Sequence, residues 1–448
     1  MYPHEYPGAL WYDQQEIDAV TKVITNKSPF RYYGVKFDEE VLNFEKELGE
    51  YLSTTSISNE NQQNKIYVTA VNSGTGALEI ALDVLGVGSG DEVIVPGFMW
   101  ISSISAIIRS RAIPVLVDSD QTLGVDPKDL KAKITERTKV VMVVPMLGGS
   151  SKIGEIMDVV RKVNNSSEKE NLSKILVLED CAQSLGAHAY GIPGSSQTNL
   201  PMGCYKLGTF GDIGTFSLQL NKGITAGEGG MIVTRNKELH ERIDALHNAG
   251  YIKKEKNNIN WYGDIPYGWG HGRRMCELQG AVARIQLKKL DSILDNIRKN
   301  HRFFEKIFKK QGIKLRKQAY QNNPGDTGYY LCFHLPENLD DNIAILKGRE
   351  IANDLKNKGF NVWFLHDFEV HIYYNIEPLV KKFPMYDGSP WEDPRNDFHI
   401  QYSYDRGALP NLDHLLIRTI GINMPSKMSD NTRENMMNDL LITLNNLY

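Results

Sequence analysis

The chain has 448 residues, of which 41% are hydrophobic and 24% charged, and its net charge at pH 7 is −4. This composition is typical of a globular protein long enough for two or more domains, without the basic face that binding to nucleic acid requires. Its four cysteines form no CxxC pair, which disfavours a disulfide framework, and we predict no metal site. The N-terminus has no signal-peptide pattern, and no uncharged apolar run approaches the roughly 18 residues that span a membrane. We therefore expect a soluble cytoplasmic protein with no membrane partner.

Short apolar runs alternate along the chain with stretches long enough to hold helices. The first run is KIYVTAV at residues 65–71. Later runs that predict buried strands are Val93–Pro96, Ile113–Asp118, Val140–Leu147, Ile175–Asp180 and Thr215–Leu220. Because parallel strands buried on both faces are continuously apolar, this alternation predicts an α/β fold in which helices cover both faces of a parallel sheet.

Two segments have apolar residues at helical spacing. One comes directly after the first apolar run, and the other comes after the last. The first follows Ser73-Gly74-Thr75 and ends before Gly86, a glycine in the C-cap position. The second follows Arg274 and is amphipathic, with a stripe formed by Met275, Leu278, Val282 and Ile285. Polar stretches predict surface loops at residues 53–65, 164–171 and 191–201.

The apolar alternation weakens after about Ile297, where helical and strand-like pieces mix. We therefore predict a large domain over residues 18–290 and a smaller α+β domain over residues 291–448. The N-terminal segment 1–17 is expected to pack near the smaller domain.

Residues that follow strands are the candidates for a site, because ligands of α/β sheets bind beyond the carboxyl ends of the strands. Asn72-Ser73-Gly74-Thr75-Gly76 joins a strand to a helix. Free N–H groups at such a helix start attract an anion such as phosphate, although a capped turn without a ligand is equally compatible with the pattern. The spacing fits neither GxGxxG nor a P-loop, which disfavours a dinucleotide or ATP.

Five further residues lie at or after strand ends, and all of them except Gln183 have two possible roles. Asp180 could cap a helix or pair with a cationic ring nitrogen, and Gln183 would face the same cavity. Trp100 could be core or could stack on a heteroaromatic ring, and Ser217 could bind phosphate or only a neighbouring backbone group. Lys222, between an apolar run and the turn GEGG, would alone be interpreted as a solvated loop lysine.

In combination these features describe one ligand, pyridoxal 5'-phosphate (PLP). They offer a cradle for its phosphate, an indole for its ring, an acid for its ring nitrogen and an amine for its aldehyde. The acid keeps the pyridine protonated so that the ring can accept electrons. The lysine forms a Schiff base and then moves protons.

Four segments carry a family resemblance: SGTGALEIALDVLGVGSGDEVIVPGFMW, EDCAQSLGA, GDIGTFSLQLNKGITAGEGG and RRMCELQGAVARIQLKKLD. In order and rough spacing they resemble the sugar aminotransferases of the DegT/StrS family, and the stretch from the lysine to GEGG is highly specific. The resemblance runs from about Tyr33 to Asp291. It implies the aspartate-aminotransferase type of fold (type I of the PLP-dependent transferases), with a mostly parallel seven-stranded sheet. It also implies a homodimer whose two active sites borrow residues across the interface.

The resemblance assigns expected roles to the candidate residues. Lys222 would be the Schiff-base lysine and proton-transfer group, Asp180 would pair with the pyridine nitrogen, and Gln183 would lie near the phenolic oxygen. Trp100 occupies the ring-stacking position. The phosphate-binding positions are Gly74, Thr75 and Ser217.

The chain departs from the family pattern in two places. Family members usually carry Asn-x-Arg-Met before the ELQGA helix, and the asparagine reaches the partner subunit's phosphate. This chain has Gly272-Arg273-Arg274-Met275 there, so either Arg273 or His271 substitutes or the contact differs. The segment 191–207 is also longer than the usual turn, which implies a reshaped site entrance.

The resemblance implies an aminotransferase that moves an amino group from L-glutamate or L-glutamine to a keto-sugar, nucleotide-linked in the leading reading. The alternatives are a keto-sugar acid or inosose as acceptor, or a non-catalytic binding or regulatory paralogue. A related sugar dehydratase carries histidine in place of the lysine, so Lys222 argues against that activity. Segments 28–34 (SPFRYYG) and 362–374 (VWFLHDFEVHIYY) are expected to help line the sugar pocket.

Overall fold

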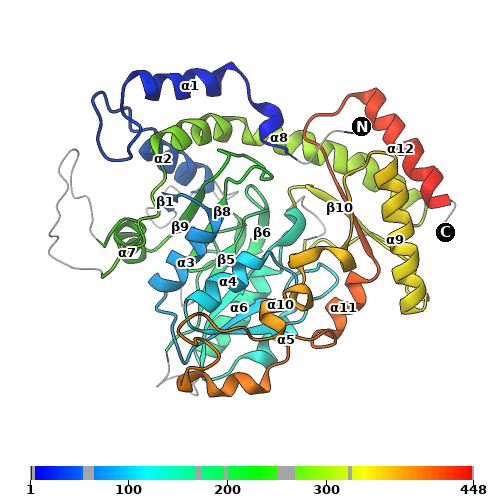
Figure 1. Cartoon of the computed structure of the whole chain (residues 1–448). Coiled ribbons are helices and arrows are strands. Elements are labelled where there is room, and N and C mark those ends of the chain that lie inside the picture. The colour runs from blue at the N-terminus through cyan, green and yellow to red at the C-terminus, as the bar shows by residue number, and fades with distance from the viewer. Residues whose placement is uncertain are drawn as a thin grey trace.

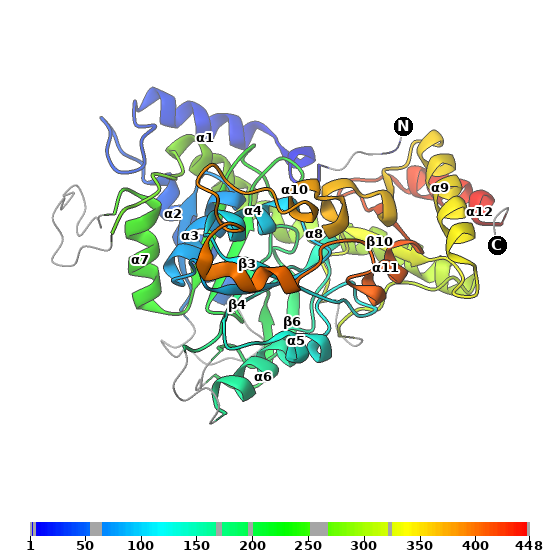
Figure 2. The same ribbon diagram turned by 60° about the horizontal axis from the view of Figure 1, so that its bottom comes forward.

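The structure is a computed structural model that describes residues 2, 6–53, 65–166, 173–195, 200–250, 268–320 and 325–445. Most of the predicted loop 53–65, and parts of the predicted loops 164–171 and 191–201, lie outside the described residues. Figures 1 and 2 show α9 and α12 at one end of the molecule and α7 at the other, with the long helix α8 running between the two ends.

A seven-stranded sheet with the strand order β1-β9-β8-β5-β4-β2-β3 forms the centre of the larger part. Its strands are β1 (Tyr67–Val71), β2 (Glu92–Pro96), β3 (Ile113–Val117), β4 (Thr138–Val143), β5 (Leu176–Asp180), β8 (Ile213–Ser217) and β9 (Gly230–Thr234). The pairs from β8 to β3 are parallel, whereas β9 is antiparallel to both β1 and β8. The predicted α/β fold with a mostly parallel sheet is confirmed.

Two predicted strands differ from the observed ones in ways that shape the site. The predicted run Val140–Leu147 continues as strand only to Val143, since Pro145 has no N–H for a ladder and a 3₁₀ turn, η3 (Met146–Gly148), follows it. The predicted run Thr215–Leu220 is β8, which begins at Ile213 and ends at Ser217. Strand β9 was not predicted, because the glycines before it indicate only a turn.

Side chains on the two faces of the sheet enter two separate cores, as expected for alternating strand residues. Val141 and Val143 of β4 pack in the core that includes helices α2 (Glu40–Ser53), α6 (Ile153–Asn164) and α8 (Glu277–Lys310). Val140 and Met142 pack in the core that includes α3 (Gly74–Val84), α4 (Ile101–Arg109) and α7 (Lys237–His247). Helices therefore cover both faces, as predicted. Helix α1 (Gln14–Thr25) precedes these on the chain, and α5 (Pro127–Lys133) lies between α4 and α6.

The C-terminal part contains a second, antiparallel sheet of three strands, β10 (Tyr330–His334), β12 (Thr419–Asn423) and β11 (Val362–Phe364), in that order. Its helices are α9 (Asp341–Asn357), α10 (Glu377–Val380), α11 (Pro410–Leu416) and α12 (Asp430–Asn445). A short hairpin of β6 (His188–Gly191) and β7 (Gly203–Lys206) brackets the long segment before β8. No helix of the described ranges is long and apolar enough to cross a membrane.

Helix α8 continues without a break through residue 290, so a domain boundary at that position would fall inside a helix. Met275, the first residue of the predicted stripe, lies before the helix and is buried. The N-terminal segment contacts the C-terminal part: the Tyr2 and Phe360 rings are 4.8 Å apart, and Trp11 Nε1 donates to Ser426 Oγ at 3.2 Å. The domain limits themselves stay a prediction.

Candidate active site

A cavity of about 370 Å³ opens at the carboxyl ends of the parallel strands. Its wall contains every residue that the sequence singled out as catalytic or cofactor-binding: Gly74, Thr75, Trp100, Asp180, Gln183, Ser217 and Lys222. These residues come from four separate segments of the chain, so their convergence depends on the fold. The role of each one stays a prediction.

One end of the cavity is the N-terminus of α3. The Ser73 side chain caps this helix by accepting from the Gly76 N–H at 3.0 Å. The first N–H groups of a helix have no intrahelical acceptor and point out of its end, which makes the end suited to an anion. A side chain at Gly74 would place its Cβ only 2.9 Å from Ser217 Cβ, so glycine is required for α3 and β8 to approach so closely. Thr75 Oγ1 lies 2.8 Å from Ser102 Oγ at the same end.

Asp180 supplies a buried carboxylate deeper in the cavity. Ser103 Oγ donates to its Oδ2 at 2.8 Å, and the Ala182 N–H reaches Oδ1 at 3.3 Å. Burial raises the pKa of the Asp180 carboxyl, while these two hydrogen bonds and the charge of Lys222 act in the opposite direction. Residues 181–187 form turns and no helix, so the helix-cap reading of Asp180 is wrong. The buried carboxylate thus has one good donor, Ser103, and one weak donor, the Ala182 N–H. Such a carboxylate can still accept from a cationic ring nitrogen.

Lys222 lies on a loop that several hydrogen bonds hold in place. Its own N–H donates to Gln219 O at 3.0 Å, and the next residue back, Asn221, accepts from Tyr329 Oη at 2.7 Å. The glycine-rich turn GEGG ends this loop at Gly230, where a Cβ would lie 2.4 Å from Ser73 O. The turn therefore lets β9 start directly against the α3 N-terminus and fixes where Lys222 enters the cavity.

Gln183 and Trp100 complete the predicted set. Gln183 Oε1 accepts from the Leu147 N–H at 2.7 Å, and Leu147 has a positive φ of 58°, an uncommon conformation for a non-glycine residue. Trp100 precedes α4 and is 44% exposed, so it is not plain core; its ring centroid is 4.7 Å from that of His371.

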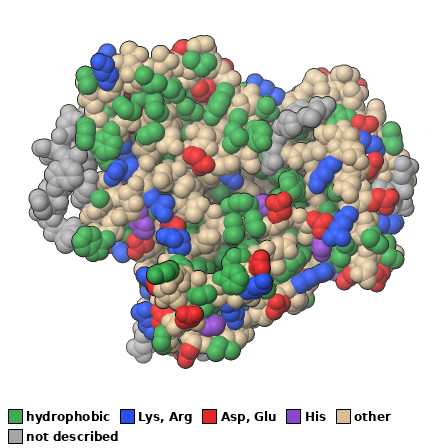
Figure 3. All heavy atoms as spheres, in the orientation of Figure 1, with side chains coloured by type: hydrophobic (Ala, Val, Ile, Leu, Met, Phe, Trp, Pro, Cys, Tyr) green, Lys and Arg blue, Asp and Glu red, His purple; other side chains and the backbone are tan. Residues whose placement is uncertain are grey.

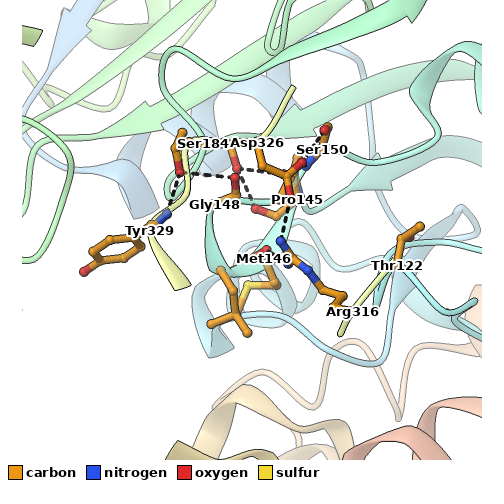
Figure 4. Close-up of polar contacts among 12 residues, drawn as sticks. Thr122, Pro145, Met146, Gly148, Ser150, Ser184, Arg316, Asp326 and Tyr329 are labelled. Carbon is orange, nitrogen blue, oxygen red and sulfur yellow. Dashed lines mark hydrogen bonds and ion pairs between the residues drawn. The ribbon is translucent and has the colours of Figure 1, made fainter. Parts of the chain in front are cut away.

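Figure 4 shows how a cluster from the C-terminal part holds the loop that carries Leu147. Arg316 Nη2 donates to Asp326 Oδ2 at 2.6 Å, and both side chains are buried. Asp326 Oδ1 in turn accepts from the Ser150 N–H at 2.8 Å. On the other side of the loop, Ser184 Oγ donates to Pro145 O at 2.7 Å. The backbone that positions Gln183 is thus tied at both ends to groups outside the cavity.

The expected sugar-pocket segments behave differently from each other. Of residues 362–374, Trp363, Phe368, Glu369 and His371 line the cavity. None of residues 28–34 does so in this chain; Arg31 there is buried and its Nη2 is 2.6 Å from Glu45 Oε1. Tyr329 and Tyr330 also line the cavity, and no sequence signal marked them.

The region that departs from the family pattern is tied to α3. His271 Nε2 lies 2.9 Å from Asp83 Oδ2, and Arg273 forms an ion pair with Glu79. Gly272 between them has φ +65°, and a Cβ there would meet open space. Both candidate substitutes for the missing asparagine therefore have partners within the same chain.

A lysine, a buried aspartate and a helix N-terminus around one cavity of such a sheet are the arrangement expected of the type I PLP-dependent transferases. The family model described as the DegT/DnrJ/EryC1/StrS aminotransferase family matches residues 12–381, and the chain belongs to this family.

Two curated relatives illustrate the range of similar proteins. The L-glutamine:2-deoxy-scyllo-inosose aminotransferase of Streptoalloteichus tenebrarius is 35% identical over 60% of this chain and 58% of the relative. The GDP-perosamine synthase of Escherichia coli O157:H7 is 36% identical over 53% of this chain and 57% of the relative. The match thus spans less than two thirds of these curated relatives.

Solved structures share the fold over the full length. A putative sugar aminotransferase from Streptococcus pneumoniae, solved in a PMP form, gives a TM-score of 0.74 at 19% identity and covers 100% of both chains. An aminotransferase from Psychrobacter cryohalolentis gives 0.73 at 22% identity and covers 100% of this chain and 99% of its own.

Proposed function

We propose that this protein is a PLP-dependent aminotransferase that takes an amino group from L-glutamate or L-glutamine and transfers it to a keto-sugar. The acceptor in this proposal is nucleotide-linked, and the product is an amino sugar for a surface polysaccharide or a secondary metabolite. The observation that carries the proposal is the joint position of Lys222, Asp180 and the α3 N-terminus on one cavity.

The residues present fit PLP. When bound, PLP supplies an aldehyde that reacts with amines and a ring that draws electrons from the attached carbon. The α3 N-terminus, with Gly74, Thr75 and Ser217, would hold its phosphate, and Trp100 would cover its ring. Asp180 would hold a proton on the ring nitrogen, and its burial strengthens that pairing because little water competes. Lys222 would bind the cofactor and then move a proton on the substrate.

The names of the relatives frame the choice of acceptor. One acts on an inosose and takes L-glutamine as donor, whereas the other is named for a GDP-linked amino sugar. An inosose is therefore the second candidate acceptor class. A keto-sugar acid stays the alternative that the family resemblance implies.

A homodimer is part of the proposal. Exposed apolar side chains gather over α1 and the segments after it, with Ile17, Ile24, Tyr33, Val35 and Leu42 among them, and Figure 3 shows hydrophobic side chains collected over α1. An apolar surface of this kind favours burial against another protein surface. Sedimentation equilibrium should give twice the chain mass, and I24E together with V35E should lower it. A monomer with full turnover would contradict this part.

A cytoplasmic location is also proposed. The four cysteines, Cys181, Cys204, Cys276 and Cys332, are all free thiols, as suits a reducing compartment.

The test of the function is the visible spectrum of the purified protein with PLP, before and after L-glutamate or L-glutamine. The band of lysine-bound cofactor should form and then bleach with one donor, and K222A should lack the band. If the wild-type protein forms no band, the proposal that it is a PLP-dependent enzyme is wrong. If a band forms that no donor bleaches, the protein catalyses a different PLP reaction.

A further inference from the structure

His371 lies in the expected pocket segment 362–374 and is a histidine on the cavity wall that the sequence did not single out. It belongs to the 3₁₀ turn η6 (Glu369–His371) of the C-terminal part, far in sequence from Lys222. Its main chain pairs with the loop before Trp100: the Met99 N–H donates to His371 O at 3.0 Å, and an antiparallel bridge links Phe98 to Ile372. Two parts of the chain therefore fix the ring beside the site.

The ring of His371 is also fixed. It stacks on Phe368, with centroids 3.9 Å apart and planes 10° apart, and its other neighbour is the Trp100 ring at 4.7 Å. Nδ1 lies 3.1 Å from Phe368 O. Because a carbonyl oxygen only accepts, Nδ1 must carry the hydrogen, and the neutral ring then has its lone pair on Nε2.

The surroundings keep the ring neutral. Burial lowers the pKa of His371 to about 4; the hydrogen bond to Phe368 O acts in the opposite direction, and the positive charge of Lys222 lowers the pKa further. The other charged side chains on this wall are Asp180, Glu228 and Glu369. At neutral pH the ring therefore donates from Nδ1 to Phe368 O, and its Nε2 is free to act as a hydrogen-bond acceptor on the cavity side.

We propose that His371 is a substrate-binding residue whose Nε2 accepts a hydrogen bond from a hydroxyl of the acceptor, a ring ketone with hydroxyl groups. This rests on the proposed function and adds to it a residue that favours binding of the acceptor over binding of the amino-acid donor. A lone pair attracts a hydroxyl but repels the carboxylates of the amino-acid donor. The flat Phe368–His371 stack would also contact a face of the sugar or cyclitol ring.

The first experiment is histidine-selective ¹⁵N NMR of the unliganded protein, with H371F to assign the signal. His371 should show the tautomer with hydrogen on Nδ1 at pH 7 and should stay neutral down to about pH 5, given a pKa near 4. A ring protonated on Nε2 at pH 7 would overturn the proposal whichever acceptor is used.

The second experiment separates the two half-reactions. H371F keeps an aromatic stack but lacks the acceptor atom, and H371Q restores an acceptor through its amide oxygen. The matched control is H366F, because His366 is on the adjacent turn and does not line the cavity. The probes are L-glutamate and L-glutamine for the donor side, and 2-deoxy-scyllo-inosose and GDP-perosamine (run in reverse) for the sugar side.

H371F should bleach the cofactor band with the donor at the wild-type rate, within twofold. Its KM for whichever sugar probe reacts should rise about tenfold, the effect of one hydrogen bond, and H371Q should recover most of it. An equal loss with donor and sugar, or no change with either, would overturn the role of His371 while leaving the aminotransferase intact. A wild-type protein that no donor bleaches would instead refute the proposed function.

Discussion

Replacing Asp180 by asparagine should change the stability of the unliganded protein and its affinity for PLP in opposite directions. Asp180 is 5% exposed and burial raises its pKa, so its charge is unfavourable in the unliganded protein even though the charge of Lys222 acts in the opposite direction. An incompletely paired buried group costs about 1–3 kcal/mol, and D180N should therefore stabilise the unliganded protein by about that amount at pH 7. The amide oxygen can still accept from Ser103.

The affinity for PLP should change in the opposite direction and become weaker. A hydrogen bond between charged groups contributes about 1.5–3 kcal/mol, so D180N should weaken PLP binding by roughly 10- to 150-fold. The pH dependence follows from the same cause. An acid with a raised folded-state pKa stabilises the fold at low pH, and this stability is lost as pH rises through that pKa. The decrease in stability with rising pH that Asp180 causes should be absent in D180N.

The assays are urea denaturation of the unliganded protein and fluorescence titration with PLP. The matched control is D212N, because Asp212 is partly buried and also has a raised pKa, but it accepts from Val177 N–H and Ser195 Oγ outside the cavity. D212N should leave PLP affinity unchanged. If D180N binds PLP as tightly as the wild type does, Asp180 does not hold the ring nitrogen.

Three further changes test other parts of the structure. Burial raises the pKa of Glu277, which accepts from the first N–H groups of α2, to about 7; stability should therefore fall by up to about 2 kcal/mol from pH 5 to pH 8, after allowance for solvent screening. E277Q should flatten this dependence in urea denaturation, and an unchanged slope would assign it to another group. R316M would leave the buried Asp326 carboxylate without its ion-pair partner and should lower the free energy of unfolding by about 3–5 kcal/mol in the same assay. A decrease below about 1 kcal/mol would show that the pair does not hold the loop after β4. G272N should change stability by less than about 1 kcal/mol, because asparagine tolerates a φ of +65° and meets open space there. Calorimetry of PLP binding should show tighter binding if residue 272 reaches a partner subunit's phosphate, and equal affinity would argue against that contact.

Much of the site could be predicted because its residues follow strand ends in recognisable turns. Gly74, Asp180 and Lys222 each come directly after, or within five residues of, an apolar run, and the topology of a parallel sheet brings such positions together. Strand β9 escaped prediction because GMIVT is short and its glycine indicates a turn as much as a strand.

Segment 362–374 was expected to line the pocket, but which of its residues do so, and what holds the neighbouring loop, could not be predicted. Both depend on contacts that join distant parts of the chain. The bridge between Phe98 and Ile372 brings His371 next to Trp100. These two residues are far apart in the sequence, so no local pattern predicts their pairing. The clamp of Arg316 and Asp326 likewise depends on how the segment after α8 folds back on the loop after β4. The sequence marked the segment of His371 as a whole but not this residue, and it gave no signal for the pair of Arg316 and Asp326.

The identity of the lysine that holds PLP is the central claim, and borohydride reduction followed by peptide mass mapping tests it most directly. Reduction fixes the cofactor covalently to the lysine that binds it, and the account predicts the label on Lys222 alone. The chain offers an internal competitor, because burial lowers the pKa of Lys206 to about 8 and leaves part of that amine uncharged at neutral pH. A label on Lys206 or another lysine, with Lys222 unmodified, would contradict the account.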